Sequence, residues 1–268
     1  MEFEKKERYT IEDLRQIMQI LRAPGGCPWD AEQTHESIRK NMIEEAYEAV
    51  DAIDSGDKAA LQEELGDVLM QVVFHAQMET ETGGFTLDDV ADGVCKKLIY
   101  RHPHVFGNVQ ADTSAQVLKN WEALKLVEKS QKSETESMQS IPRMLPALLR
   151  AEKVQKKAAR VGFDWNDAAG TFDKVAEETE ELQRAFRSGS QKQMEEELGD
   201  LLFSVVNTAR FLHVDPEQAL TGATDKFIRR FSLMEQVAKA HDLKLSDASP
   251  EQLDAFWNRA KTEEMKKS

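Results

Sequence analysis

The sequence predicts an all-α protein built from two tandem helical domains, and three observations favour this fold class. Apolar residues recur at the i, i+3, i+4, i+7 spacing of helices in several windows. No sustained alternation with a period of two is present, and the chain of 268 residues contains only 13 Gly and 7 Pro. In addition, one block of sequence occurs twice, which is typical of a tandem repeat.

Two windows near the N-terminus illustrate the helical periodicity. Each places its apolar residues on one face of a helix, so each predicts an amphipathic helix that packs through that face. The first stripe comprises Ile43, Ala46, Tyr47, Val50 and Ile53, and the second comprises Leu65, Val68, Leu69, Val72, Val73 and Ala76.

The repeat relates residues 44–67 to residues 177–200. Its offset is constant, since 177 − 44 = 133 and 200 − 67 = 133. The Ser-Gly pair at 55–56 recurs at 188–189 with the same offset. Each copy therefore predicts two helices joined by a short turn.

Outside this block the two copies match with small gaps in the loops. Both copies carry a basic helical segment and flanking tryptophans, so each copy is interpreted as a complete unit that ends in a Trp-bearing helix. The matched features are KLIYRH from Lys97 with KFIRRF from Lys226, Trp121 with Trp257, and Trp29 with Trp165.

A polar segment separates the two copies. The sequence LVEKSQKSETESMQSIPRMLP is rich in Ser, Glu, Lys and Gln and is closed by two prolines. This composition predicts a linker, and the first proline marks a point where a new helix can begin. We therefore predict an N-terminal domain over residues 1–132, a polar linker over 133–140 and a C-terminal domain over 141–268.

Charge and composition exclude several classes of protein. The net charge of −14, from 49 acidic and 35 basic residues, repels nucleic-acid backbones. No apolar run reaches the roughly 18–20 residues that span a bilayer, and the N-terminal residues lack an apolar signal region, so we expect a cytoplasmic protein without a membrane segment. Two cysteines, Cys27 and Cys95, are interpreted as reduced packing residues.

Each copy contains four carboxylates at a fixed spacing. In the second copy, Glu178 and Glu181 lie three residues apart on one predicted helix, and Glu197 and Asp200 repeat this spacing on the next. The antiparallel hairpin brings the two pairs together, where they repel one another unless a cation lies among them. Oxygen ligands without Cys or His select Mg²⁺, or Mn²⁺ in its place, over zinc. The first copy carries the same set as Glu45, Glu48, Glu64 and Asp67.

A solvated acidic helix face is the alternative interpretation of these residues, because charged residues normally decorate exposed surfaces. Two features favour the metal site. Glu64 and Glu197 lie at the edge of the apolar stripe, and the spacing of all four acids is kept in a second copy whose intervening residues have largely changed.

The complete set of motifs resembles the MazG-type nucleotide pyrophosphohydrolases. EExxE followed by ExxD, together with GGCPWD near the N-terminus, RHPHVF in the first copy and VGFDW before the second, carries the resemblance over essentially the whole chain. It implies two tandem helical-bundle domains of the all-α NTP pyrophosphatase type. It also implies Mg²⁺-dependent hydrolysis of nucleoside triphosphates to the monophosphate and pyrophosphate by a homodimer.

The resemblance also implies roles for particular residues of the second copy. Glu177, which precedes the metal ligand Glu178, is a candidate general base. A lysine before the acidic pair, a basic cluster on a later helix and a C-terminal tryptophan bind the triphosphate in such proteins. The substrate-binding set is then Lys174, Glu177, Glu178, Glu196, Asp200, Lys226, Arg229, Arg230 and Trp257.

The two copies differ in their cations. Asn41 stands in the first copy where the second has Lys174, and Tyr100 stands where it has Arg229. The first copy therefore offers two fewer positive groups to a triphosphate. We predict that the second copy carries most of the catalysis.

Some residues and functions remain open at this stage. His102 and His104 are interpreted as capping or packing residues, with metal binding as the alternative. Trp29 and Trp165 are interpreted as core anchors, with nucleotide stacking as the alternative. Two other functions compete with the pyrophosphohydrolase: a non-catalytic metal-binding helical dimer that binds a protein partner, and a sanitiser specific for non-canonical nucleotides.

Overall fold

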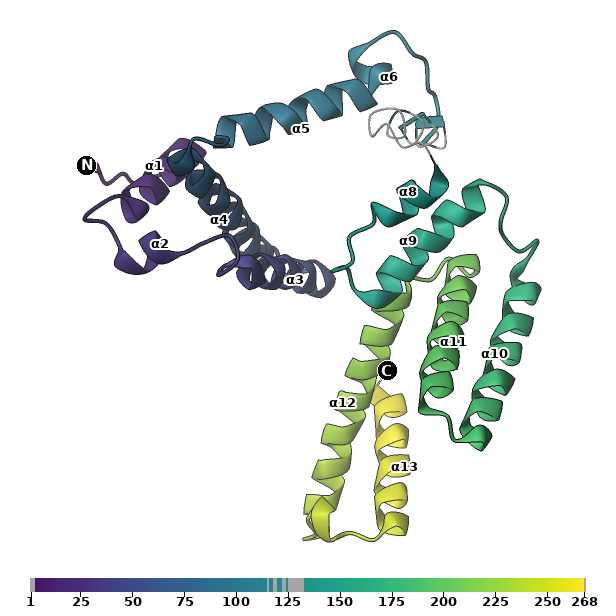
Figure 1. Ribbon diagram of the computed structural model, residues 1–268. Helices are drawn as coiled ribbons and strands as arrows, with labels where there is room; N and C mark the ends of the chain where they lie inside the picture. Colours follow the sequence, from purple (N-terminus) through teal and green to yellow (C-terminus); the bar gives the residue numbers. More distant parts are fainter. Residues whose placement is uncertain (1–2, 115, 118–119, 122–123, 125–132, 268) are drawn as a thin grey trace. The chain divides into compact units, whose positions relative to one another are not determined.

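The computed structural model describes residues 3–114, 116–117, 120–121, 124 and 133–267. Every regular element among these residues is a helix, which confirms the predicted fold class (Figure 1). The chain divides into two compact units, Met1–Glu128 and Lys129–Ser268. None of the helices described is both long and apolar enough to cross a membrane.

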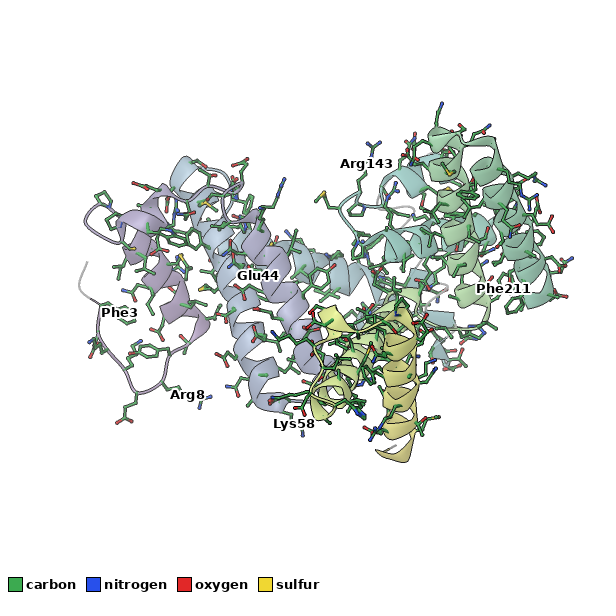
Figure 2. All side chains as sticks on the ribbon, turned by 90° about the horizontal axis from the view of Figure 1, so that it is seen from below. Phe3, Arg8, Glu44, Lys58, Arg143 and Phe211 are labelled. Atoms are coloured by element: carbon green, nitrogen blue, oxygen red, sulfur yellow. The ribbon has the colours of Figure 1, made fainter. Side chains whose placement is uncertain are left out.

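The N-terminal unit is organised around a helical hairpin. Helices α3 and α4 pack along each other, α1 packs against α4, and α5 leaves the far end of α4 (Figure 1). In Figure 2, Glu44 on α3 and Lys58 at the start of α4 mark the two arms of this hairpin. The helices are α1 (Ile11–Arg22), α2 (Pro28–Glu32), α3 (Arg39–Ser55), α4 (Lys58–Thr82), α5 (Leu87–Arg101) and α6 (Pro103–Phe106).

The Ser-Gly pairs form the turns that the repeat predicted. Gly56 ends α3 with φ of 70°, and Gly189 ends the corresponding helix of the second copy with φ of 73°. Glycine adopts this left-handed conformation without the steric cost of a Cβ. In each copy the next helix is capped at once, by the side chain of Asp57 in the first and of Ser190 in the second.

A small apolar core fills the space between α1, α3 and α4 in this unit. Val73 and Ala76 of the predicted second stripe are buried there, whereas Leu65 and Leu69, nearer the turn, are exposed. Within one chain, the predicted burial of the second apolar stripe is therefore confirmed only for its C-terminal half. The core comprises Met18, Ile38, Val73, Phe74 and Met78, with Leu14, Met70 and Leu87 packed against it.

A cluster of histidines fastens the loop before α3 to helix α4. His35 Nδ1 lies 2.7 Å from His75 Nδ1, and His35 Nε2 lies 2.9 Å from Glu79 Oε1. The two imidazole rings are stacked, with centroids 5.0 Å apart. Because one of the two facing Nδ1 atoms must donate and the other accept, the pair shares a single proton between them. The cluster was not foreseen, since its members are 40 residues apart in sequence.

The C-terminal unit contains two hairpins. Helices α10 and α11 form the first, with α9 packed on α11, while α12 and α13 form the second (Figure 1). The second hairpin meets α9 and α11 near the start of α12 and then extends away from α10 and α11. The elements are α8 (Glu134–Gln139), α9 (Ala147–Arg160), α10 (Ala168–Ser188), α11 (Gln191–Phe211), α12 (Pro216–Ala240), a short 3₁₀ turn η1 (Leu245–Asp247) and α13 (Pro250–Lys267).

Residues 133–140, predicted as a polar linker, form helix α8 instead. Ser133 caps this helix by accepting a hydrogen bond from the backbone N–H of Glu136. Ser137 is buried against α9, where it is hydrogen-bonded to Lys157. The polar side chains are thus used in capping and packing, which composition alone does not reveal. The earlier part of the polar segment, residues 126–132, lies outside the described residues.

The structure corrects or confirms several interpretations of single residues. Trp29 and Trp165 are 59% and 44% exposed, so neither is the core anchor that we expected. Cys95 is also exposed, whereas Cys27 is half-buried. His102 does cap the end of α5, where its Nδ1 lies 2.7 Å from the Leu98 carbonyl oxygen.

Candidate functional site

The α10–α11 hairpin brings three of the predicted acids of the second copy together. One carboxylate oxygen each from Glu178, Glu197 and Asp200 lies within 4.8 Å of the other two. Glu178 is only 4% exposed, Glu197 is half-buried and Asp200 is exposed. The group therefore runs from the seam between the helices to the solvent, so a ligand can approach it from one side.

Glu178 occupies a core position on α10. Thr171, Glu178 and Ala185 are the buried residues of this helix, and their spacing of seven residues places them on one stripe that faces α11. A carboxylate at such a position costs free energy unless its charge is compensated. A merely solvated acidic face would not require a buried carboxylate, so the burial of Glu178 argues against that interpretation.

Lys174 compensates one oxygen of Glu178. The Lys174 ammonium lies 2.6 Å from Glu178 Oε1 and 3.0 Å from Glu177 Oε1, and these hydrogen bonds raise the pKa of the lysine. The second oxygen, Glu178 Oε2, is buried and has no hydrogen-bond partner among the described residues. An orphaned carboxylate oxygen beside two further carboxylates is a fitting ligand for a hard divalent cation.

The fourth acid of this copy, Glu181, lies beside the group of three. The pKa of Glu197 is raised first by its partial burial and then by the charges of Glu181, Glu178 and Asp200. Glu181 also accepts a hydrogen bond from Arg184 at 2.8 Å. The structure therefore brings all four predicted acids together near the middle of the hairpin, with three close enough to share an ion.

The first copy has a related but distinct arrangement. Here Glu45, Glu48 and Glu64 are the three residues whose oxygens lie within 4.8 Å of one another. Partial burial raises the pKa of Glu45, and the charge of Asp67 is the next cause. Asn41 stands where the second copy has Lys174, so no ammonium group occupies that position. This cluster is the more negative of the two.

The predicted cations and tryptophan of α12 and α13 lie in a separate place within the C-terminal unit. Arg230 Nε is 2.6 Å and Arg229 Nε is 3.6 Å from the carboxylate of Glu264, which joins α12 to α13. Trp257 packs against Phe227, with ring centroids 5.1 Å apart. No contact described for this unit links these side chains, or the exposed Lys226, to the carboxylates of α10 and α11. One chain thus holds the predicted substrate residues in two groups.

A pocket that sequence reasoning missed adjoins the carboxylates of the C-terminal unit. Its volume is about 660 Å³, and it lies among α9, the loop that follows α9, α10 and α11. Lys174 belongs to both sites, because it lines this pocket and contacts Glu178. The aromatic walls are Phe163, Trp165 and Phe203, and the polar lining residues include Gln155, Asp164, Ser204, Asn207 and Arg210.

Comparison with known sequences decides the family. Residues 33–106 and 167–232 match the family described as the MazG nucleotide pyrophosphohydrolase domain. The chain belongs to the MazG family. Both matched segments contain one of the four-carboxylate sets, so the family's domain occurs in each unit of this chain.

Curated MazG relatives cover nearly the full length of the chain. It is 46% identical to the nucleoside triphosphate pyrophosphohydrolase/pyrophosphatase MazG of Thermotoga maritima, over 96% of this chain and 98% of the relative. It is 45% identical to the nucleoside triphosphate pyrophosphohydrolase of Escherichia coli K12, over 95% and 98% of the two chains. It is also 46% identical to the uncharacterized protein YabN of Bacillus subtilis, over 97% of this chain but 53% of that protein.

Proposed function

We propose that this MazG-family chain hydrolyses nucleoside triphosphates, both ribo- and deoxyribonucleotides, to the monophosphate and pyrophosphate. The names of its near full-length relatives support the reaction. The observation that carries the assignment to a site is the buried Glu178, whose free Oε2 lies in a group with Glu197 and Asp200.

The donor set of the C-terminal group fits Mg²⁺, with Mn²⁺ as a substitute. All its ligand atoms are carboxylate oxygens, which hard cations prefer, and the group is open to solvent for the waters that Mg²⁺ retains. When bound, such an ion neutralises phosphate charge and activates a water molecule. Glu178, Glu181, Glu197 and Asp200 are the proposed ligands in this unit, and Glu45, Glu48, Glu64 and Asp67 in the other.

The residues around this group supply the remaining chemistry. A water oxygen forms a bond to the α-phosphorus, the bond from that phosphorus to the bridging oxygen breaks, and pyrophosphate leaves. Glu177, which is exposed and lies one residue from Glu178, is the proposed acceptor of the water's proton. The Lys174 ammonium donates hydrogen bonds to the phosphates, as a cation that already lies at the site.

The C-terminal unit is the proposed main catalytic unit. It has Lys174 beside its carboxylates, and the counterpart in the N-terminal unit is the neutral Asn41. A triphosphate approaching the N-terminal acids meets repulsion without a local ammonium to offset it. We propose that the N-terminal site is the weaker one.

A homodimer completes the proposal. The helices of the C-terminal unit leave large apolar side chains exposed on α11 and α12, and exposed apolar faces of this extent are typical of protein interfaces. A second copy that covers these faces can also bring Lys226, Arg229, Arg230 and Trp257 into the substrate site, where Glu196 already lies next to Glu197. The exposed side chains are Leu198, Leu202, Phe203, Leu220, Phe227, Ile228 and Phe231.

Product analysis tests the proposed reaction. The full chain is incubated with each NTP and dNTP and with Mg²⁺, and the products are separated and identified. Pyrophosphate plus monophosphate is the expected result. Inorganic phosphate as the product would contradict the proposed bond cleavage, and the absence of any product would identify the chain as a binding protein.

A further inference from the structure

The pocket among α9, α10 and α11 contains a polar group that none of the described residues satisfies. Gln155 lines this pocket and is only 6% exposed. Its Nε2 donates a hydrogen bond to the Phe203 carbonyl oxygen at 2.7 Å, while its Oε1 is buried without a hydrogen-bond partner in the described structure. The bond to Phe203 fixes which way the amide points, because the reversed amide would place two oxygens against each other. The pocket wall therefore contains a buried hydrogen-bond acceptor that is held in one orientation and is unpaired within the described structure.

Aromatic residues make up much of the remaining pocket wall. Trp165 and Phe163 lie on the loop after α9, and Phe203 lies on α11. Asp164 on the same loop is paired with Arg210, whose Nη1 lies 3.0 Å from Asp164 Oδ2. A pocket of about 660 Å³ with aromatic walls and a buried acceptor is typical of a site for a flat heterocycle.

The helical spacing connects this pocket to the carboxylates. On α11, Asp200, Ser204 and Asn207 follow the i, i+4, i+7 spacing of one face, and the last two line the pocket. Seven residues of helix rise about 10 Å, which is comparable with the length of a nucleoside. On α10, Thr171 and Lys174 line the pocket, and Lys174 also contacts Glu178, so this helix connects the pocket to the carboxylates as well.

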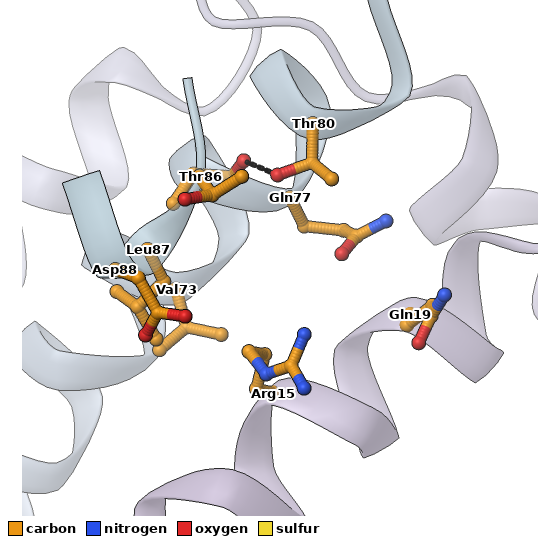
Figure 3. A pocket seen from close by; sticks show the side chains of 9 residues that line it. Arg15, Gln19, Val73, Gln77, Thr80, Thr86, Leu87 and Asp88 are labelled. Atoms are coloured by element: carbon orange, nitrogen blue, oxygen red, sulfur yellow. Dashed lines mark hydrogen bonds between the residues drawn. The ribbon is translucent and has the colours of Figure 1, made fainter. Parts of the chain in front are cut away.

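The N-terminal unit fills the corresponding space with larger side chains. With the offset of 133, Asn207 corresponds to Phe74 and Thr171 to Ile38, and both counterparts are buried in the apolar core. Gln155 is the buried residue of α9, whereas α1, which packs against α4 in the N-terminal unit, buries the apolar Met18 in the same core as Ile38 and Phe74. The pocket drawn in Figure 3 lies elsewhere in this unit, between α1, α4 and the start of α5, and has a volume of only about 90 Å³. The open pocket is therefore a feature of the C-terminal unit rather than of the repeat.

We propose that this pocket binds the base of the nucleoside triphosphate and that Gln155 Oε1 accepts a hydrogen bond from the base. The inference rests on the proposed function, which it deepens by assigning base recognition. Adenine and cytosine offer an exocyclic amino group, and guanine, uracil and thymine offer a ring N–H. A single acceptor therefore admits all the standard bases and rejects bases whose donor is methylated.

Methylated nucleotides test this assignment. We expect the full chain to prefer ATP over N6,N6-dimethyl-ATP, and UTP over N3-methyl-UTP, by about tenfold or more in kcat/KM, since a buried acceptor left unpaired is costly. Gln155→Met, which is close in size but lacks the acceptor, should reduce both preferences to near one. Gln19→Met, which makes the same change at an exposed residue of the N-terminal unit, should leave them intact. Preferences that survive Gln155→Met would overturn the proposal.

A second variant and a binding measurement keep the test independent of turnover. Asn207→Phe introduces the side chain of the N-terminal copy and should raise the Kd for AMP, measured by calorimetry in EDTA, by about tenfold or more. An unchanged Kd in a folded Asn207→Phe protein would overturn the proposal. If the wild type releases no pyrophosphate but binds AMP in a manner sensitive to both variants, the proposed reaction fails while the base pocket stands.

Discussion

The ammonium of Lys174 lies 2.6 Å from one oxygen of Glu178, and the other oxygen of the same carboxylate is buried without a partner among the described residues. The Glu178 carboxylate is therefore neutralised at one oxygen, while its other oxygen stays available to a ligand. The lysine lowers the cost of burying Glu178 in the seam between α10 and α11. The free oxygen retains the capacity to bind a cation together with Glu197 and Asp200.

Replacement of Lys174 should separate metal binding from substrate binding. In Lys174→Asn, which copies Asn41 of the other unit, the competing positive charge at Glu178 is removed, so Mg²⁺ alone should bind several-fold more tightly. The KM for ATP should rise about tenfold because a cation for the triphosphate is lost. Calorimetry with Mg²⁺ and steady-state kinetics measure the two effects. A parallel weakening of both would show that the lysine acts only through the fold.

The two carboxylate sets should contribute unequally to activity. Glu178→Gln should lower kcat for pyrophosphate release about 100-fold or more, because it removes a charged ligand from the proposed principal site. Glu45→Gln is the matched change in the N-terminal unit and should cost less than about threefold. Equal losses in the two variants, with unchanged melting temperatures, would contradict the assignment of the C-terminal unit as the main catalytic one.

Mg²⁺ should raise the free energy of unfolding of the chain by an amount set by its concentration relative to its Kd. At a concentration of 100 times the Kd, a ligand specific to the native state adds about 2.7 kcal/mol. The C-terminal unit should therefore melt at a higher temperature in Mg²⁺ than in EDTA, and Glu197→Gln should largely abolish the difference. Ca²⁺ and Zn²⁺ at equal concentration serve as comparisons for ion preference. A melting temperature indifferent to Mg²⁺ would argue against the metal site.

The histidine cluster should make the N-terminal unit sensitive to acid. Burial, followed by the charge of His35, lowers the pKa of His75 from its ordinary 6.5. The folded chain then binds fewer protons than the unfolded chain in the window below pH 6.5. The free energy of unfolding should be highest above that pH and fall as the pH drops through the window toward the folded pKa.

Thermal melts between pH 8 and 5 test this dependence. His75→Phe keeps an aromatic ring beside His35 but removes the titrating group, so its melting temperature should change less with pH. His213→Asn alters a histidine with positive φ, a conformation that asparagine tolerates, and should preserve the wild-type profile. Identical profiles for all three proteins would exclude His75 as the cause.

Gly170 should control the position of the pocket wall. A Cβ built at this residue would lie 2.7 Å from Cε3 of the Trp165 ring, so Gly170→Ala must displace the indole. We expect altered tryptophan fluorescence and a several-fold rise in the KM for ATP, because the ring forms part of the pocket. Gly222→Ala is the control, since a Cβ there meets no atom within 4 Å. Loss of activity in the control but not in Gly170→Ala would contradict the role of Trp165.

The sequence by itself determined the helical class, the two copies and the acidic sets. These features depend on local spacing: apolar residues repeat with the period of a helix, and Ser-Gly pairs end the first helix of each hairpin at Gly56 and Gly189. The four acids of each copy could be placed on one hairpin because residues three apart share a helix face.

Only the tertiary structure decided which side chains face each other across helices. The burial of Glu178 beside Lys174, the separation of Arg229 and Arg230 from the acids, and the free acceptor of Gln155 all depend on how the helices pack. The sequence shows that Asn207 stands in the second copy where the first has Phe74, but it does not show that a pocket is open at that position. Whether a polar residue opens a pocket depends on what α9 and its loop place near it, and those segments are distant in the sequence: Asp164 of the loop pairs with Arg210 of α11, 46 residues further along the chain.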